Sequence, residues 1–264
     1  MKLNSSIKLV AVGAAALALV VTPAANAGST LVVGGASSVA SVVGDCKVAY
    51  SAATGDSFAY ASSSSGQGQK DMEAGKDDFA FSDSAHSPMI ANEIHIPTVL
   101  WPVAILTNLG GSNKPVTLST DTLAGIMAGK ITNWNDPAIV ADNNRTINTV
   151  IYKKDAAGKV VKDKNGAPVV LRTHPVTQHR TMPNLPITVW YRSDNSGTSN
   201  NLTRALNKLA PTVWTNSPAD AFATAFPGKI TDNPVMFRSA SGSAGVALNI
   251  SKTKGSIGYA EVSF

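Results

Sequence analysis

Three short segments rich in glycine, serine and threonine have the composition of an anion-binding site. They are Gly34-Gly35-Ala36-Ser37-Ser38, Ser64-Ser65-Gly66-Gln67-Gly68 and Ser196-Gly197-Thr198, and each lies between a predicted strand and a predicted helix. Backbone N–H groups at the start of a helix are free and carry partial positive charge, and hydroxyl groups add further donors, so such a turn suits an oxyanion. Serine and threonine also cap helices for structural reasons, which would explain any one of the turns alone. Three of them, with an arginine beside the last, favour a binding site.

The arginine beside the third turn has a carboxylate close to it. Arg192 and Asp194 lie two residues apart at the end of a predicted strand, so both side chains can reach one site. A guanidinium matches tetrahedral oxyanions with paired hydrogen bonds, and Asp194 could hold it in place. The alternative is a surface ion pair, which would contribute little.

Asp83 is a less obvious member of such a site. A buried carboxylate repels a fully ionised anion, but it accepts a hydrogen bond from an anion that carries a proton. Asp83 therefore predicts a protonated oxyanion as ligand. A structural role in a turn or a helix cap stays open for this residue.

Sequence motifs for catalysis are missing. The sequence has no G-x-S-x-G, H-E-x-x-H or P-loop motif and no cluster of metal-ligand residues, so we expect no enzyme, no metal and no cofactor. A phosphatase-like hydrolase, the alternative from another class, would need a nucleophile or a metal. The single cysteine, Cys46, excludes an internal disulfide, and its valine-rich surroundings predict a buried, inert thiol.

The elements that must position these residues repeat one order: apolar strand, Gly/Ser turn, helix. Strands are predicted at 31–33, 58–61 and 78–81, with helices at 37–48 and 69–74. This alternation is typical of a parallel α/β sheet. The most apolar stretch after residue 27, residues 97–107, suits a strand buried on both faces or a segment that crosses between two lobes. In residues 149–190, the run Asp163-Lys164-Asn165-Gly166 between valine-rich flanks predicts a β-hairpin.

The N-terminal residues 1–27 are typical of a secretory signal. Lys2 and Lys8 form a basic region before an apolar stretch, Leu9 to Val21, that is short for a membrane span. Ala25-Asn26-Ala27 resembles a cleavage site. Gly28 follows, so no lipidated cysteine is indicated. Removing the two lysines lowers the formal net charge from +5 to +3, a weak basic balance that does not point to nucleic acid.

Several segments resemble the family of periplasmic phosphate-binding (PstS) proteins, the substrate-binding subunits of phosphate ABC transporters. They are LVVGGASS from Leu31, SSSSGQG at 62–68, DDFAFSDSA at 77–85, LAGIMAGKITNWNDPAI at 123–139, YRSDNSGTSNNLT at 191–203 and SIGYAEV at 256–262. The resemblance implies a two-lobed α/β fold of the type II periplasmic-binding-protein class, which closes on its ligand by a hinge motion. It places the signal at 1–27, the first lobe at 28–102 plus 256–264, and the second lobe at 103–255 with a hairpin excursion at about 149–190.

The resemblance also implies which residues hold phosphate. Donors are expected from Ser37, Ser38, Ser65, Arg192, Ser196, Gly197 and Thr198, with Asp83 accepting the ligand's proton and Asp194 orienting Arg192. The expected protein is a periplasmic or secreted monomer whose partners are inorganic phosphate and transporter permease subunits. A secreted relative with a scavenging, adhesive or structural role is the alternative.

Two features depart from the family pattern. Ser37 and Ser38 replace a threonine and a phenylalanine. The family also continues for roughly a hundred residues after the SIGYAEV strand, enough for part of a domain. The first lobe is therefore expected to be incomplete.

Overall fold

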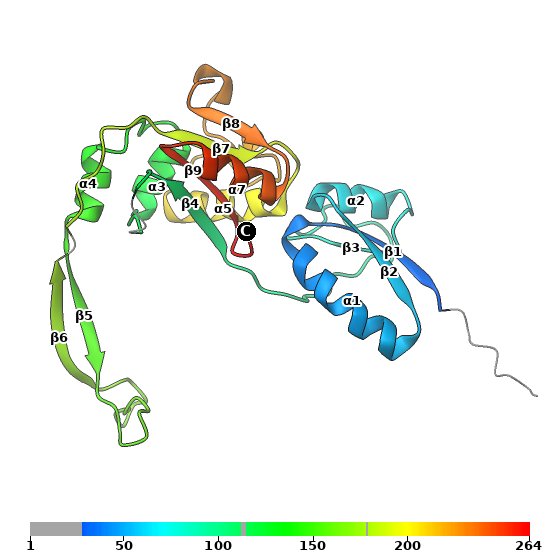
Figure 1. Cartoon of the computed structure of the whole chain (residues 1–264), viewed down its shortest axis with the longest axis horizontal. Helices are drawn as coiled ribbons and strands as arrows, with labels where there is room; N and C mark the ends of the chain where they lie inside the picture. Colours follow the sequence, from blue (N-terminus) through cyan, green and yellow to red (C-terminus); the bar gives the residue numbers. More distant parts are fainter. Residues whose placement is uncertain (1–27, 112–114, 178) are drawn as a thin grey trace, which may run out of the picture.

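The computed structural model describes residues 28–111, 115–177 and 179–264. The expected secretory signal at 1–27 lies outside these residues. The described chain forms a two-lobed α/β structure with a separate β-ribbon (Figure 1). We call residues 28–102 the first unit and residues 103–264 the second unit.

The first unit is a three-stranded parallel sheet in the order β2-β1-β3. Its elements are β1 (Thr30–Gly35), the 3-10 turn η1 (Ser37–Val39), α1 (Ala40–Thr54), β2 (Ser57–Ser62), α2 (Ser65–Glu73) and β3 (Phe79–Phe81). The core is small and comprises Val33, Val39, Val43 and Phe58. Since so few apolar side chains are fully buried, this sheet serves mainly to carry the turns that follow β1, β2 and β3.

The second unit contains a four-stranded sheet in the order β4-β9-β7-β8. Its strands are β4 (Val103–Asn108), β7 (Thr188–Arg192), β8 (Phe237–Ala240) and β9 (Ser256–Glu261). Its helices are α3 (Thr120–Met127), α4 (Pro137–Asn143), α5 (Gly197–Leu209), α6 (Phe222–Ala225) and α7 (Gly242–Lys252), with a 3-10 turn η2 (Ile230–Asp232). β7 is parallel to β8 and β9, whereas β4 is antiparallel to β9.

The position of β9 corrects one expectation. We expected residues 256–264 to belong with residues 28–102, but β9 lies between β4 and β7 in the sheet of the second unit. All six of its residues are buried. β9 pairs with β4 along all six residues and with β7 through Ser256, Ile257 and Gly258, a central placement that suits a strand whose residues are all buried.

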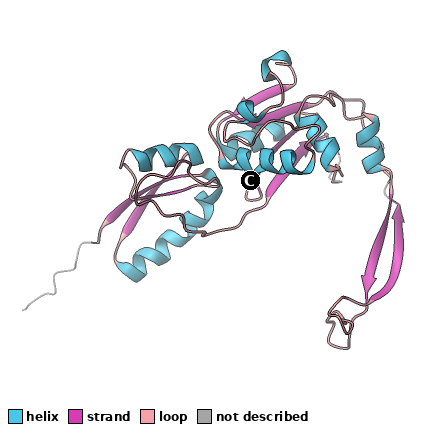
Figure 2. Cartoon of the chain, turned by 180° about the vertical axis from the view of Figure 1, so that it is seen from behind, coloured by secondary structure: helices cyan, strands magenta, loops and turns pink. Residues whose placement is uncertain are grey.

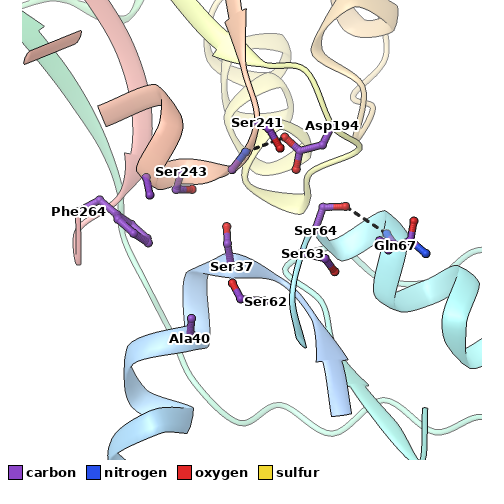
Figure 3. A pocket seen from close by; sticks show the side chains of 12 residues that line it. Ser37, Ala40, Ser62, Ser63, Ser64, Gln67, Asp194, Ser241, Ser243 and Phe264 are labelled. Carbon is purple, nitrogen blue, oxygen red and sulfur yellow. Dashed lines mark hydrogen bonds between the residues drawn. The ribbon is translucent and has the colours of Figure 1, made fainter. Parts of the chain in front are cut away.

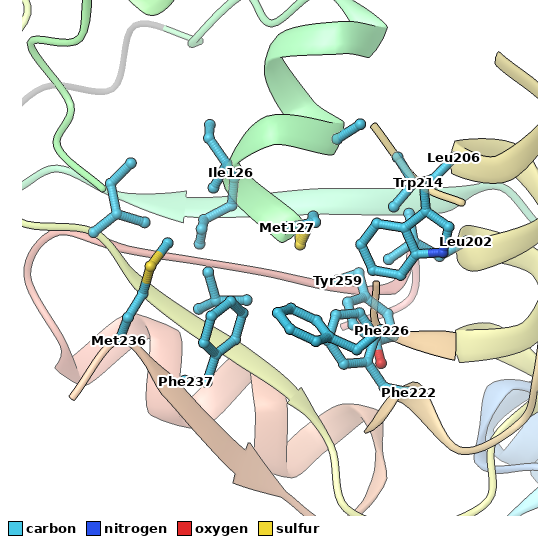
Figure 4. Packing of buried hydrophobic residues seen from close by; sticks show 14 of the residues in the cluster. Ile126, Met127, Leu202, Leu206, Trp214, Phe222, Phe226, Met236, Phe237 and Tyr259 are labelled. Carbon is cyan, nitrogen blue, oxygen red and sulfur yellow. The ribbon is translucent and has the colours of Figure 1, made fainter. Parts of the chain in front are cut away.

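A large aromatic and aliphatic core supports this second sheet (Figure 4). Phe222 lies at its centre, with ring centroids 5.1 Å from Tyr191, 5.6 Å from Trp214 and 5.8 Å from Tyr259. The side chains of Trp134, Trp214 and Tyr259 are completely buried. The second unit therefore has a much larger hydrophobic core than the first.

The apolar stretch at 97–107 divides into two parts. Residues 103–108 form β4, a half-buried strand at the sheet edge, and residues 97–102 cross from the first unit to the second (Figure 1). The crossing segment is largely exposed, with Leu100 95% exposed.

The antiparallel ribbon of β5 (Thr146–Tyr152) and β6 (Val170–Thr177) occupies the stretch where the Asp163–Gly166 turn predicted a hairpin. It extends away from both sheets (Figure 2). Cys46, expected to be buried, is exposed, because Val43 is the only fully buried residue of α1. No helix among the described residues has the length and apolar character needed to cross a membrane.

Candidate functional site

Four helical segments begin at one place between the two units. In each unit, two parallel strands end in a turn that starts a helical segment: β1 leads to η1 and β2 to α2, while β7 leads to α5 and β8 to α7. The carboxyl ends of parallel strands share one edge of a sheet, which is where ligands bind in α/β proteins. The turn before α7, Ser241-Gly242-Ser243, has the same composition as the three turns identified from the sequence.

A cavity of about 540 Å³ lies at this junction (Figure 3). The first unit contributes Ser37, Ala40, Ser62, Ser63, Ser64 and Gln67, and the second contributes Asp194, Ser241, Gly242, Ser243, Ala244 and Phe264. The Ser37 hydroxyl is buried and has no hydrogen-bond partner among the described residues. An unpaired buried hydroxyl at the edge of a polar cavity is available to a ligand.

Asp83 connects the two units. Its Oδ1 accepts a hydrogen bond of 2.5 Å from the hydroxyl of Ser38 in the first unit. Its Oδ2 accepts one of 3.0 Å from the hydroxyl of Thr198 in the second unit. Its backbone N–H donates to the Ser65 hydroxyl at 3.1 Å. A carboxylate has about four acceptor positions, so Asp83 can still accept from a ligand.

Two glycines allow the units to approach this closely. A Cβ on Gly197 would lie 2.5 Å from the backbone nitrogen of Ser84 and 2.7 Å from the Cβ of Asp83. A Cβ on Gly66 would lie 2.6 Å from the Cβ of Asn195, and the Gly66 N–H donates to the Asn195 carbonyl at 3.0 Å. The start of α5 therefore packs directly on the Asp83 turn, and the start of α2 packs on the loop before α5.

Further hydrogen bonds fasten the Asp83 turn to the second unit. The Ser84 hydroxyl donates to Oδ2 of Asp220 at 3.0 Å, and the Asn201 amide donates to the Asp83 carbonyl at 2.8 Å. Both contacts lie beside the Asp83 carboxylate and hold it at the interface between the units.

His86 anchors the same loop to the first unit. Its ring nitrogens bond to Glu73 of α2 at 3.0 Å and to Glu93 at 2.9 Å. Burial lowers the pKa of His86, but the hydrogen bonds to the two carboxylates outweigh this effect and raise the pKa above its ordinary value. The ion pairs of His86 therefore fix the loop that presents Asp83.

Arg192 is a buried cation at the end of β7, and its residue is only 3% exposed. Its Nε donates to Oδ1 of Asp194 at 2.9 Å, and one Nη2 hydrogen bonds to the other oxygen of Asp194. One Nη1 hydrogen bonds to the Ser243 hydroxyl at 2.9 Å. A guanidinium has five N–H groups, so two remain for a ligand. Burial raises the pKa of Asp194, but the hydrogen bonds and charge of Arg192 outweigh it and hold the pKa below its ordinary value.

Glu261, at the end of β9, completes this network. Ser243 donates its hydroxyl hydrogen to Oε2 of Glu261 at 2.6 Å, while Oε1 is buried without a partner among the described residues. The residue is 2% exposed. Burial raises the pKa of Glu261, and the nearby charge of Asp83 raises it further, whereas the Ser243 hydrogen bond only partly offsets them. Burial thus favours the protonated form of this carboxyl, compared with an exposed glutamate.

All nine residues predicted from the sequence lie at the ends of strands of the two units or in the turns that follow them, and two of them, Ser37 and Asp194, line the cavity. Ser37, Ser38, Ser65 and Asp83 lie on the first unit, and Arg192, Asp194, Ser196, Gly197 and Thr198 lie on the second. The Ser196 hydroxyl caps α5 by accepting from the Ser199 N–H, so it already serves a structural role.

Ser243 and Glu261 were not predicted from the sequence. The signal for Ser243 was a fourth strand–Gly/Ser turn–helix segment, and the signal for Glu261 was an acidic residue inside an apolar strand. In the part of the chain that the structure describes, no group of three or more His, Cys, Asp or Glu residues is placed to hold a metal.

Comparison with known proteins gives consistent matches. Residues 20–264 match the model of the PBP superfamily domain. A phosphate-binding protein PstS from Xylella fastidiosa is 26% identical over 237 residues, which is 87% of this chain and 52% of the relative. PstS 2 from Mycobacterium tuberculosis is 30% identical over 169 residues, 64% of this chain and 34% of the relative. The chain thus spans about half the length, 52%, of the Xylella relative that it matches.

Solved structures show the same fold. A high affinity periplasmic phosphate-binding protein solved with phosphate is 26% identical, with a TM-score of 0.57 over 87% of this chain and 55% of that one. A phosphate-binding protein from Stenotrophomonas maltophilia, 24% identical, has a TM-score of 0.56 over 88% of this chain and 60% of that one.

The burial of Glu261 predicts a pH-dependent cost in stability. A carboxyl whose pKa is higher in the folded protein than in the unfolded chain destabilises the fold as pH rises above the unfolded value, here 4.5. Glu261→Gln keeps an acceptor for Ser243 but cannot ionise. We expect its melting temperature relative to wild type to be constant below about pH 4 and to increase as the pH is raised toward about pH 8. Thermal unfolding of both proteins across this pH range tests the prediction. A difference in melting temperature that is independent of pH would show that the fold does not raise the pKa of Glu261.

Proposed function

The chain belongs to the PBP superfamily, and from that premise we propose that it is a periplasmic or secreted binding protein for inorganic phosphate that delivers the ion to an ABC transporter. The observation that carries the proposal is the arrangement of Arg192 and Asp83 at one interface: a buried guanidinium with two free N–H groups, and a carboxylate that bridges the two units and can still accept. The names of the curated relatives point to the same ligand.

The donor groups at the junction fit a tetrahedral oxyanion. The starts of η1, α2, α5 and α7 offer backbone N–H groups and hydroxyls from both units. We assign donor roles to Ser37, Ser38, Ser65, Ser196, Gly197 and Thr198 together with Arg192, while Asp194 orients the guanidinium. Ser38 and Thr198 would donate through their backbone N–H groups, because their hydroxyls donate to Asp83. Contacts made with both units at once would favour the closed arrangement when the ion is bound.

Asp83 selects the protonation state of the ligand. Phosphate near neutral pH carries at least one proton, which it can donate to a carboxylate, and sulfate carries none. Asp194 is paired with Arg192 and Glu261 accepts from Ser243, so we assign to Asp83 the role of the carboxylate that faces a bound anion. The site therefore favours phosphate over a fully ionised anion of the same shape.

We propose that residues 1–27 direct export, that the permease subunits of a phosphate transporter are the partners, and that the protein acts as a monomer. We place the boundary between the lobes at residues 102 and 103, with residues 256–264 in the second lobe.

Removing the guanidinium should abolish high-affinity binding. For Arg192→Ala we expect a loss of about 2–5 kcal/mol in the binding free energy of inorganic phosphate, because a buried, charge-assisted contact is removed. Isothermal titration calorimetry measures the affinity for phosphate. Arg192→Lys should recover only part of the lost affinity, because lysine cannot form two parallel hydrogen bonds to a pair of phosphate oxygens. Arg238→Ala, at an exposed position on β8, is the matched control and should bind as wild type does. An affinity near wild type in a folded Arg192→Ala protein would contradict the site.

Replacing the selecting carboxylate should change the discrimination between anions. Wild type should bind phosphate far more tightly than sulfate. Asp83→Asn should narrow this gap by at least about tenfold, mainly by improved sulfate binding, since the amide N–H₂ donates to an unprotonated oxygen. Paired titrations of both anions against both proteins at low salt measure the ratio. If wild type binds sulfate as well as phosphate, Asp83 does not face the ligand; if both affinities fall and the ratio is unchanged, Asp83 only supports the loop.

A further inference from the structure

The β5–β6 ribbon with its tip, residues 146–177, is a projecting arm that the phosphate site does not use. β5 and β6 pair along their length and extend away from the second unit (Figures 1 and 2). All eight residues of β6 are exposed, and in β5 only Ile147 and Ile151 are half-buried. A two-stranded ribbon with both faces in solvent gains little from burial, so its own core does not explain why it is there.

The tip of the arm, residues 153–169, contains two copies of the same five-residue turn. Lys154-Asp155-Ala156-Ala157-Gly158 and Lys162-Asp163-Lys164-Asn165-Gly166 have the same pattern, eight residues apart, and both glycines have positive φ, +79° and +80°. We did not identify this repeat from the sequence. In each turn, the aspartate Oδ1 accepts two backbone N–H groups, at 3.0 Å for Asp155 and 2.9 Å for Asp163.

Backbone hydrogen bonds also tie the two turns together. Val161 N–H donates to the Lys153 carbonyl at 2.8 Å, and Val169 N–H donates to the Val161 carbonyl at 2.9 Å. The tip is therefore a defined structure that presents its side chains in fixed directions. Both acidic groups are bonded to the backbone of their own turns, whereas the lysines are exposed.

The arm is the basic part of the protein. It contains six Lys and Arg and two Asp, a net charge of +4, whereas the other residues from 28 onward contain 14 basic and 15 acidic side chains, a net charge of −1. Five of the basic residues are lysines at the tip: Lys153, Lys154, Lys159, Lys162 and Lys164. A concentration of charge of this kind favours a polyanionic partner.

Exposed apolar side chains lie directly beside these lysines. Tyr152 is 42% exposed, Val170 52% and Leu171 61%. They occupy the ends of β5 and β6 that adjoin the tip. The end of the arm thus combines a cluster of lysines with a tyrosine and branched aliphatic groups, the combination found where proteins lie on the surface of a charged bilayer.

We propose that the arm docks the protein on the surface of a bilayer that contains anionic lipids, with the tip lysines at the phosphate headgroups and Tyr152 and Leu171 at the edge of the acyl region. Clusters of four to eight basic residues bind such surfaces, and each residue adds to the attraction. Docking would keep a phosphate-binding protein beside the membrane while its two units stay in solution.

The composition of the arm favours this partner over two others. Nucleic-acid readout relies on arginine and on stacking aromatic rings, whereas this arm has one arginine, Arg172, and one aromatic residue, Tyr152. Pairing between arms of two copies would bring two charges of +4 together, which is unfavourable at low salt.

Vesicle sedimentation tests the proposal with the whole protein. Wild type should sediment with vesicles of equimolar phosphatidylglycerol and phosphatidylcholine at low salt, and not with pure phosphatidylcholine. Replacing the five tip lysines by glutamine should reduce the partition coefficient at least about 100-fold. Tyr152→Ser with Leu171→Ser should remove most of the binding that persists at about 0.15 M salt, where electrostatic attraction is screened.

The matched control removes the same number of positive charges from outside the arm. Lys47, Lys70, Lys130, Lys208 and Lys229 are exposed outside the arm, and their replacement by glutamine should reduce binding less than about fivefold. Phosphate affinity should be unchanged in the arm variants, which separates this proposal from the proposed function. The proposal would be overturned if the tip-lysine variant and the control-lysine variant lost equal amounts of vesicle binding, or if wild type did not sediment with the anionic vesicles. Tighter binding to duplex DNA than to the anionic vesicles, or an arm-dependent dimer in place of lipid binding, would also overturn it.

Discussion

The Asp83 carboxylate, shared between a hydroxyl of each unit, is the contact on which the closed arrangement of this protein depends. Ser38 donates to one of its oxygens and Thr198 to the other. This contact needs the start of α5 to lie against the Asp83 turn, which is possible only because residue 197 has no side chain. In the same way, α2 can approach the loop before α5 only because Gly66 has no side chain. The short strands of the first unit and the larger, close-packed sheet of the second bring these turns to one place.

The electrostatics of the site depend on three carboxyl groups that have different partners. Asp194 is bonded to Arg192 through both oxygens, so its charge is neutralised within the protein. Glu261 is buried behind Ser243, and burial raises its pKa above the ordinary value. Asp83 is left as the acceptor at the interface. An anion that enters the site meets the two free N–H groups of Arg192, the starts of four helical segments and one carboxylate. Phosphate can donate its own proton to that carboxylate in a hydrogen bond, which offsets the repulsion between the two negative groups.

The local parts of the structure could be predicted from the sequence, whereas the non-local parts could not. Strand–turn–helix order and the turns at Ser37, Ser65 and Ser196 depend on residues close in the chain, and the structure has elements at those places. The sheet to which β9 belongs depends on pairing with strands far away in sequence, and the prediction that placed β9 with the first unit was wrong. β8 was not predicted, because a four-residue strand with half of its residues exposed has almost no hydrophobic pattern. Cys46 was expected to be buried from its valine neighbours, yet α1 covers a sheet too small to bury more than one face.

A crystal structure of the protein grown with inorganic phosphate tests the central claim most directly. The account predicts one phosphate ion between the two units, with one oxygen within hydrogen-bond distance, about 2.5–2.7 Å, of an Asp83 carboxylate oxygen. Other oxygens should contact the Arg192 guanidinium and the backbone N–H groups at the start of α5. A phosphate ion bound at a different place, or a junction that stays free of phosphate in a crystal saturated with the ion, would contradict it.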